Sequence, residues 1–108
     1  MTFERVVVIA PTHPSLPGHF PGYPVVPGVV LLDEIMDSLS RMLQEPVYVT
    51  ELPSVKFLSP LRPGEALTVC LEQEESGQAL FRCLLGARLV AQGTVTFTVG
   101  QPAKKADR

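Results

Sequence analysis

The sequence predicts an α+β fold in which one long helix is wrapped by a curved antiparallel β-sheet. Residues 28 to about 44 carry apolar side chains at helical spacing, more convincingly than any other stretch. Residues 47–99 change to the period of two that marks strands, and a short β-branched segment, residues 3–10, precedes the helix. A single helix with a wide apolar stripe needs cover on most of its sides, which a curved sheet provides. The open edges of such a sheet favour pairing between two chains.

Composition and length set the limits of this fold. The 108 residues suffice for one domain, expected to span residues 1–100, and the polar tail 101–108 is expected to be disordered. The longest apolar run, residues 25–32, is too short to cross a bilayer, and the first residues lack the features of a secretory signal. We therefore expect a cytoplasmic protein away from membranes. A net charge of -2 and the lack of a recognition motif argue against nucleic acid as a partner.

The predicted helix begins at Pro27-Gly28, because a proline there needs no partner for its missing N–H, and it ends before Pro46. At about 100° per residue, Asp33 falls at the margin of the apolar stripe and Glu34 on the polar side. We therefore expect Asp33 to be the partly buried acid of the helix, beside Val29. The stripe consists of Leu31, Leu32, Ile35, Met36, Leu39, Met42 and Leu43.

Five strands are expected after the helix, at residues 47–50, 55–58, 65–75, 78–85 and 92–99. A two-residue turn at Ser76-Gly77 makes Glu75 face Gln78 and places Cys70 opposite Cys83. That register puts the apolar residues of the two strands on opposite faces of the sheet. A bulge or a longer turn would bring them to the same face, and it would also separate the two sulfurs. Both thiols are expected to stay reduced. The cysteines lack a partner histidine at ligand spacing, so no metal site is expected.

The loop that leads into the helix is the most informative stretch. Residues 19–28 read His-Phe-Pro-Gly-Tyr-Pro-Val-Val-Pro-Gly, and these prolines and glycines stiffen the backbone and leave its amides open to a ligand. The first amides of the helix lack intrahelical acceptors, and with the macrodipole they form a site for a carbonyl or an anion. His19 lies before that site and Asp33 after it. A base, an oxyanion donor at Gly28 and an acid together indicate a catalytic site.

These residues resemble the 3-hydroxyacyl-acyl-carrier-protein dehydratases of the hot-dog superfamily, and the resemblance extends along the whole chain. Its strongest part is Gly-His-Phe-Pro-Gly at residues 18–22, Pro-Val-Val-Pro-Gly-Val at residues 24–29 and an acid, Asp33, fourteen positions (33 - 19) after the histidine. A weaker match is Val-Lys-Phe at residues 55–57 with Leu-Arg-Pro-Gly-Glu at residues 61–65. One departure is Asp37, because members of the family usually carry Gln one turn after the acid.

The resemblance implies the hot-dog fold and the dehydration of a 3-hydroxyacyl thioester to the trans-2-enoyl thioester, in fatty acid, polyketide or aryl polyene biosynthesis. The substrate would be carried on the phosphopantetheine of acyl carrier protein, with no metal or other cofactor. The resemblance implies that His19 is the base, that Asp33 comes from the other subunit of a homodimer or higher oligomer, and that the Gly28 amide is the oxyanion donor. The residues expected to bind the substrate are Phe20, Pro21, Gly22, Val29, Leu32 and Met36.

Two other functions remain open. Hot-dog thioesterases also combine a helix-end oxyanion site with a carboxylate, but they generally lack the His-Phe-Pro-Gly loop. A non-catalytic acyl-binding or partner subunit is the second alternative, which Asp37 and the short chain allow. Four basic residues form either a rim for an acidic carrier protein or scattered solvated charges: Lys56, Arg62, Arg82 and Arg88.

Overall fold

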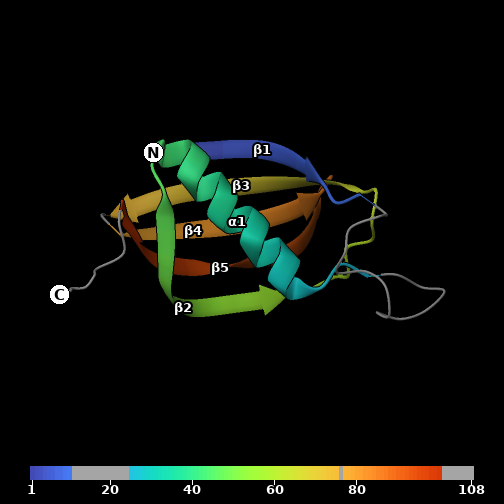
Figure 1. Cartoon of the computed structure of the whole chain (residues 1–108). Coiled ribbons are helices and arrows are strands. Elements are labelled where there is room, and N and C mark those ends of the chain that lie inside the picture. Colours follow the sequence, from blue (N-terminus) through green and yellow to red (C-terminus); the bar gives the residue numbers. More distant parts are fainter. Residues whose placement is uncertain (11–24, 76, 101–108) are drawn as a thin grey trace.

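The computed structural model describes residues 1–10, 25–75 and 77–100, and within them one helix packs on a five-stranded antiparallel sheet (Figure 1). The strand order across the sheet is β1-β3-β4-β5-β2, so β1 and β2 are its two edges. This arrangement confirms the expected fold class of one helix against a curved sheet. In chain order the elements are β1 (Thr2–Val8), α1 (Gly28–Leu43), β2 (Val47–Phe57), β3 (Ala66–Glu75), β4 (Gln78–Leu85) and β5 (Arg88–Val99).

The core lies between α1 and the face of the sheet that the helix covers. Alternate residues of the central strands point to this inner face, as the period-two pattern requires. Ile35 and Leu39 on the helix are 1% and 0% exposed, and Phe81 on β4 is 1% exposed. Burying an apolar side chain of this size contributes about 1.5 to 3 kcal/mol to the stability of the fold. The strand residues of this core include Leu67, Val69, Leu71, Ala79, Phe81, Cys83, Val95 and Phe97.

The strand that follows the helix differs from the prediction. Residues 47–50 and 55–58 were expected as two strands, but Val47–Phe57 is one strand of 11 residues. Its pairing with β5 shifts register between Val49 and Glu51 and again between Glu51 and Ser54. An edge strand tolerates such irregularities, and it also tolerates Pro53, because a proline in an edge strand need not break the hydrogen-bond ladder. Four strands therefore follow the helix within the described residues, and not five.

The β3–β4 hairpin has the bulge that the face pattern predicts. Glu75 pairs with Gln78 as expected, but the register shifts between Gln73 and Glu75. Cys83 is therefore opposite Val69, and Cys70 is opposite Arg82. The shift returns the apolar residues of both strands to the inner face. It also places the two sulfurs on opposite faces of the sheet, where they cannot form a disulfide.

Both cysteines are expected to remain free thiols. Burial raises the pKa of Cys83 to about 12, and burial, together with the nearby Glu4 carboxylate, raises that of Cys70. The Cys70 thiol donates a hydrogen bond to Glu4 Oε2 at 3.3 Å. Protonated thiols are weak nucleophiles, so alkylation should be slow while the protein is folded. Freshly purified protein, unfolded without reductant, should take up two alkyl groups per chain; a chain that takes up none would contradict this placement.

Other element boundaries lie within a few residues of their predicted positions. α1 ends at Leu43, and Gln44 takes the left-handed conformation (φ 59) that commonly caps a helix. β5 begins directly after the Gly86-Ala87 turn, four residues earlier than expected (92 - 88). The predicted tail, residues 101–108, lies outside the described residues. No helix among the residues that the structure describes is long and apolar enough to span a bilayer.

Candidate active site

Within the described residues, the first two amides of α1 lack a backbone acceptor, as expected at a helix N-terminus. Pro27 caps the helix with an extended backbone (φ -63, ψ 148) and no side-chain hydrogen bond. The first amides bonded back to Pro27 O are those of Val30 (3.0 Å) and Leu31 (3.4 Å). For the amides of Gly28 and Val29, no backbone acceptor lies within the described part of the chain. These amides can therefore receive a carbonyl oxygen or an anion.

Backbone hydrogen bonds fix the segment before α1 to the connection between β2 and β3 and fix the end of β2 to β5. The amide of Val26, a residue only 4% exposed, donates to Leu61 O at 2.8 Å. The amide of Leu58 in turn donates to Val90 O at 2.7 Å, which ties the end of β2 to β5. These bonds hold the segment before the helix against the connection between β2 and β3. The predicted oxyanion site is thus placed by the sheet and does not depend on the helix alone.

The position of Asp33 corrects the predicted phase of the helix. Asp33 is exposed, whereas Glu34 is half-buried and lies 3.7 Å from Arg5. Leu31, Ile35 and Leu39 set the centre of the buried face, and at about 100° per residue Asp33 lies roughly 160° from Leu31 around the helix. Asp33 therefore points away from the sheet. Its choice as the acid rests on its spacing from His19 and not on burial in a single chain.

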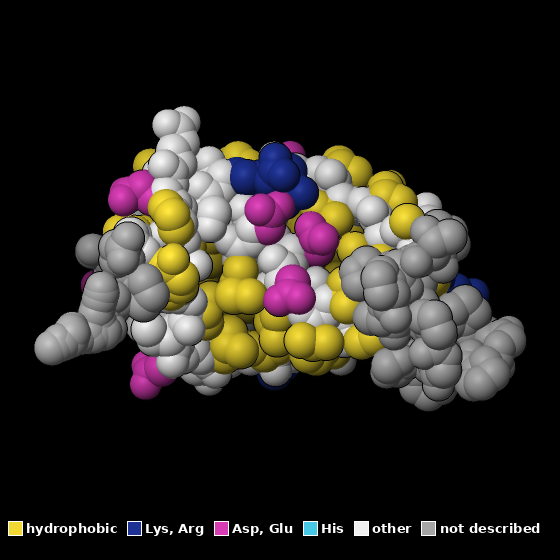
Figure 2. Space-filling view, in the orientation of Figure 1, with side chains coloured by type: hydrophobic (Ala, Val, Ile, Leu, Met, Phe, Trp, Pro, Cys, Tyr) yellow, Lys and Arg dark blue, Asp and Glu magenta, His cyan; other side chains and the backbone are white. Residues whose placement is uncertain are grey.

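Asp33 lies on a helix flank that is apolar and open. Val29, one turn before it, is 63% exposed, and Met36 is half-buried. Figure 2 shows hydrophobic side chains beside acidic groups on the side of the molecule that carries the helix. Leu32 packs partly against the core instead. An acid among exposed apolar side chains is the arrangement expected where a second chain completes a site.

The predicted loop residues fall in the part of the chain that the structure does not describe. His19, Phe20, Pro21 and Gly22 all lie outside the described residues, so their roles stay predictions. Among the described residues, Gly28 and Asp33 lie on the same helix, about 7.5 Å apart along its axis at 1.5 Å per residue. No group of three or more His, Cys, Asp or Glu residues in the described ranges could hold a metal ion.

Arg5 on β1 holds the middle of α1, a contact that the sequence did not indicate. Its Nη1 donates to Asp37 Oδ2 at 3.0 Å and to Ser38 Oγ at 2.9 Å. Ser38 is fully buried and donates its own hydroxyl hydrogen to Glu34 O at 2.7 Å. Arg41 Nε also donates to Asp37 Oδ2, at 2.9 Å. The hydrogen bond from Arg41, and the charge of both arginines, hold the pKa of Asp37 below its usual value. Asp37 is thus engaged in holding the helix to the sheet.

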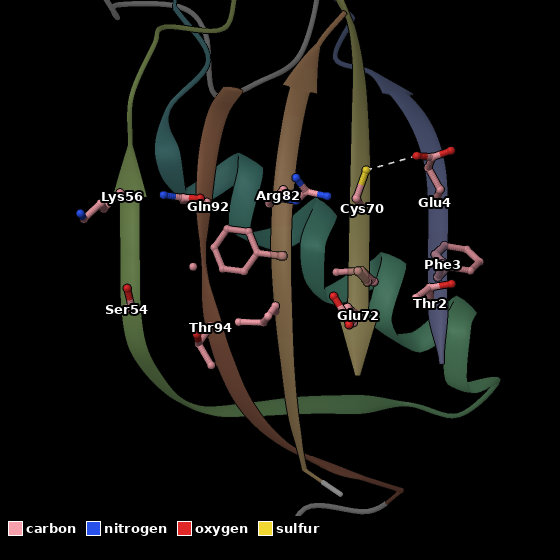
Figure 3. A pocket seen from close by; sticks show the side chains of 14 residues that line it. Thr2, Phe3, Glu4, Ser54, Lys56, Cys70, Glu72, Arg82, Gln92 and Thr94 are labelled. Carbon is pink, nitrogen blue, oxygen red and sulfur yellow. Dashed lines mark hydrogen bonds between the residues drawn. The ribbon is translucent and has the colours of Figure 1, made fainter. Parts of the chain in front are cut away.

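A hollow of about 660 Å³ lies on the outer face of the sheet, away from the predicted site. One row of side chains in this hollow crosses all five strands and consists of Glu4, Cys70, Arg82, Gln92 and Lys56 (Figure 3). None of the predicted site residues that the structure describes (Gly28, Val29, Leu32, Asp33 and Met36) lines this hollow. Lys56 and Arg82 therefore lie on the face opposite the helix, and not around the helix N-terminus. We expect the chemistry at the helix end, because the first amides of α1 and the predicted acid Asp33 lie there, whereas the hollow lies on the opposite face of the sheet.

The family model described as ApeI dehydratase, of the ApeI-like family, matches residues 2–94. The chain belongs to the ApeI-like dehydratase family. The match runs from β1 into β5 and includes the loop and the start of α1. The resemblance to hot-dog dehydratases is thereby confirmed at the level of the family.

Curated relatives of this ApeI-like chain are 3-hydroxyacyl-acyl-carrier-protein dehydratases named FabZ. That of Desulforamulus reducens is 30% identical, and the match covers 91% of this chain and 79% of the relative. That of Chlamydia trachomatis serovar D is 27% identical, and the match covers 80% of this chain and 65% of the relative. The chain thus spans just under two thirds of the length of the Chlamydia relatives.

Solved structures agree on the fold. The dehydratase heterocomplex ApeI:P from Xenorhabdus doucetiae contains a chain with a TM-score of 0.79 and 28% identity, covering 89% of this chain and 86% of that one. The fluoroacetyl-CoA thioesterase FlK has a TM-score of 0.70 at 18% identity, covering 92% and 84%. The second match shows the fold alone. Together with the strand order, these matches confirm the hot-dog fold.

The Arg5 cluster predicts two different pH responses. Because the folded pKa of Asp37 is lowered, its contribution to stability is fully present above the ordinary aspartate pKa of about 3.9 and is lost as the pH falls through the lowered pKa. Asp37 is half-exposed, so solvent screening limits this contribution to roughly 0.5 kcal/mol. Arg5→Met should cost more, about 1 to 3 kcal/mol, because it also leaves the buried Ser38 hydroxyl with one partner fewer.

Chemical denaturation at pH 7 and pH 3 separates the two effects. The difference between wild type and Asp37→Asn should shrink at pH 3. The difference between wild type and Arg5→Met should largely persist there, because Ser38 does not titrate. Arg88→Met, at the exposed start of β5, is the matched control and should change stability little. An Arg5→Met variant as stable as that control would show that the cluster does not hold the helix.

Proposed function

We propose that this chain is a hydro-lyase that removes water from a 3-hydroxyacyl thioester and forms the trans-2-enoyl thioester. The observation that carries the proposal is the open helix N-terminus at Gly28, with Asp33 outward on the same helix and a His-Phe-Pro-Gly loop directly before it in sequence. Membership of the ApeI-like dehydratase family supports the same reaction. The names of the curated relatives support acyl carrier protein as the carrier of the substrate, with the acyl group on its phosphopantetheine and no separate cofactor.

The reaction assigns one step to each group. Neutral His19, with a reference pKa of about 6.5 for histidine, takes the proton from the carbon next to the thioester carbonyl. The Gly28 amide stabilises the negative charge that develops on the carbonyl oxygen, an interaction worth roughly 2.7 to 4 kcal/mol per donor. Asp33 gives a proton to the leaving hydroxyl, which departs as water. The carbon–hydrogen and carbon–oxygen bonds break as the double bond forms, so no oxidant or reductant is needed.

The exposure of Asp33 supports a site shared between two chains. Asp33 points away from its own sheet, and Val29 beside it leaves an apolar flank open to a partner. β2 is an edge strand whose residues 50–54 are all exposed, so it can pair with a second copy. We therefore propose a homodimer in which His19 of one subunit works with Asp33 of the other. The carrier protein would approach the open helix ends.

A non-catalytic partner subunit is the second candidate. The solved neighbour from Xenorhabdus doucetiae is a heterocomplex, and Asp37 replaces the Gln that the resembled family usually carries. In that case this chain would pair with a related dehydratase chain rather than with itself. Thioester hydrolysis has weaker support, because the thioesterase neighbours share only the fold.

A carrier-bound substrate separates these functions. The purified chain is incubated with 3-hydroxyacyl carrier protein and, separately, with trans-2-enoyl carrier protein, and the acyl group is followed by mass spectrometry. A dehydratase interconverts the two in both directions, whereas a thioesterase releases free carrier thiol. His19→Ala should slow the interconversion by about 10²-fold or more. Absence of both reactions, in a chain shown to be folded, would exclude the dehydratase and leave the partner subunit.

A further inference from the structure

Phe57, the last residue of β2, packs against the first residue of α1. A side chain at Gly28 would have its Cβ 2.8 Å from Cζ of Phe57 and 3.2 Å from both Cε atoms. The ring tip therefore points end-on at Gly28 and fills the space that a side chain would take. Only glycine fits at this position while the ring stays where it is.

The backbone of Phe57 is held by strand pairing, and the residue is 51% exposed. Phe57 pairs with Ala91 on β5, and the next residue, Leu58, donates its amide to Val90 O at 2.7 Å. About half of this residue is thus exposed, next to the amides of Gly28 and Val29, for which no backbone acceptor lies in the described part of the chain. The exposed part of this ring can contact a reactant that binds at the first amides of α1.

We propose that Phe57 is a positioning residue of the oxyanion site, an inference that rests on the proposed function. The ring closes one side of Gly28, so the thioester carbonyl must approach the first helical amides from the side that remains open. It also keeps water from that side, which strengthens a hydrogen bond to the developing negative charge. Phe57 thereby acts through the geometry at Gly28 and takes no part in proton transfer.

Two substitutions at Phe57 test this role. Phe57→Ala opens the closed side and should lower kcat on the order of tenfold, with a smaller change in KM, because misplaced reactants lose rate more than binding. Phe57→Tyr adds an oxygen at Cζ, the atom nearest Gly28, and should lower kcat similarly. A ring that merely lies on the surface would accept this hydroxyl without effect. Leu58→Ala, which removes a neighbouring side chain that is 50% exposed, is the control and should keep wild-type kcat.

A double-mutant cycle locates the effect at the contact. Gly28→Ala keeps the amide but drives a methyl group into the ring, so it should lower kcat by itself. In Gly28→Ala/Phe57→Ala the methyl group has room, and the double variant should be no slower than Phe57→Ala alone, a clear departure from additivity. If the losses of the two single variants multiply in the double variant, or if Phe57→Ala or Phe57→Tyr keeps wild-type kcat, the proposal is overturned while the dehydratase function stands. A wild-type chain that neither dehydrates nor hydrates would remove the proposed function, and this role with it.

Discussion

Replacing His19 by Ala or Asp33 by Asn is expected to lower kcat by about 10²-fold to 10⁴-fold, the range typical of positioned acid and base groups. The first change removes the base, and the second keeps the shape of the acid but removes its proton. Asp33 is exposed in the single chain, so Asp33→Asn should fold and melt like the wild type. Rates with 3-hydroxyacyl carrier protein, together with melting temperatures, provide the measurement.

Glu34→Gln is the matched control for this prediction. Glu34 neighbours Asp33 on the helix but is half-buried against the sheet, 3.7 Å from Arg5. Its replacement should leave kcat within a few-fold of wild type. An essential Glu34 with a dispensable Asp33 would mean that the acid has been assigned to the wrong residue.

The second large effect is expected at Gly93, where β5 meets the bent edge strand. A side chain here would overlap the Ser54 carbonyl oxygen and lie 2.8 Å from two ring atoms of the buried Phe81. Gly93→Ala must therefore displace β2, the strand that carries Phe57, or the core ring. We expect a loss of about 3 kcal/mol in the free energy of unfolding, at the upper end for overpacked cores.

Denaturant unfolding measures this loss, with Thr94→Ala as the control. Thr94 is the next residue along β5 and points to the outer face, into the hollow (Figure 3). Its replacement should change stability by less than about 1 kcal/mol. Equal stability of Gly93→Ala and wild type would show that β2 approaches β5 less closely at Ser54 than the structure has it.

The fold was predictable because local pattern and tertiary packing agree over most of the chain. Ile35 and Leu39 stand at helical spacing and do face the core, and Leu67, Val69 and Leu71 alternate as strand residues packed on one face do. The bulge in the β3–β4 hairpin followed from the same logic, because only a shifted register brings both apolar sets together. The turn at Gly86-Ala87 correctly indicated the connection between β4 and β5.

The features that the sequence did not predict depend on contacts between residues far apart in the chain, which no local pattern contains. β2 shifts register just before Ser54, which closely approaches Gly93, a residue far away in sequence. The phase of α1 was misjudged because the small, buried Ser38, held by Arg5, extends the covered face to the polar side. Phe57 was named only as part of a weak match, and its contact with Gly28 appears only once the helix lies on the sheet. The loop carrying His19 stays a prediction.

The central claim is that His19 and Asp33 act together across two chains, and a mixing experiment tests it most directly. His19→Ala and Asp33→Asn are first assayed alone, where each should be nearly inactive. They are then unfolded and refolded together, and mixed dimers are verified by two different affinity tags. In a mixed dimer one site loses both groups and the other keeps both, so activity should return to a substantial minority of the wild-type value. Verified mixed dimers that stay as inactive as the parents would contradict the shared site.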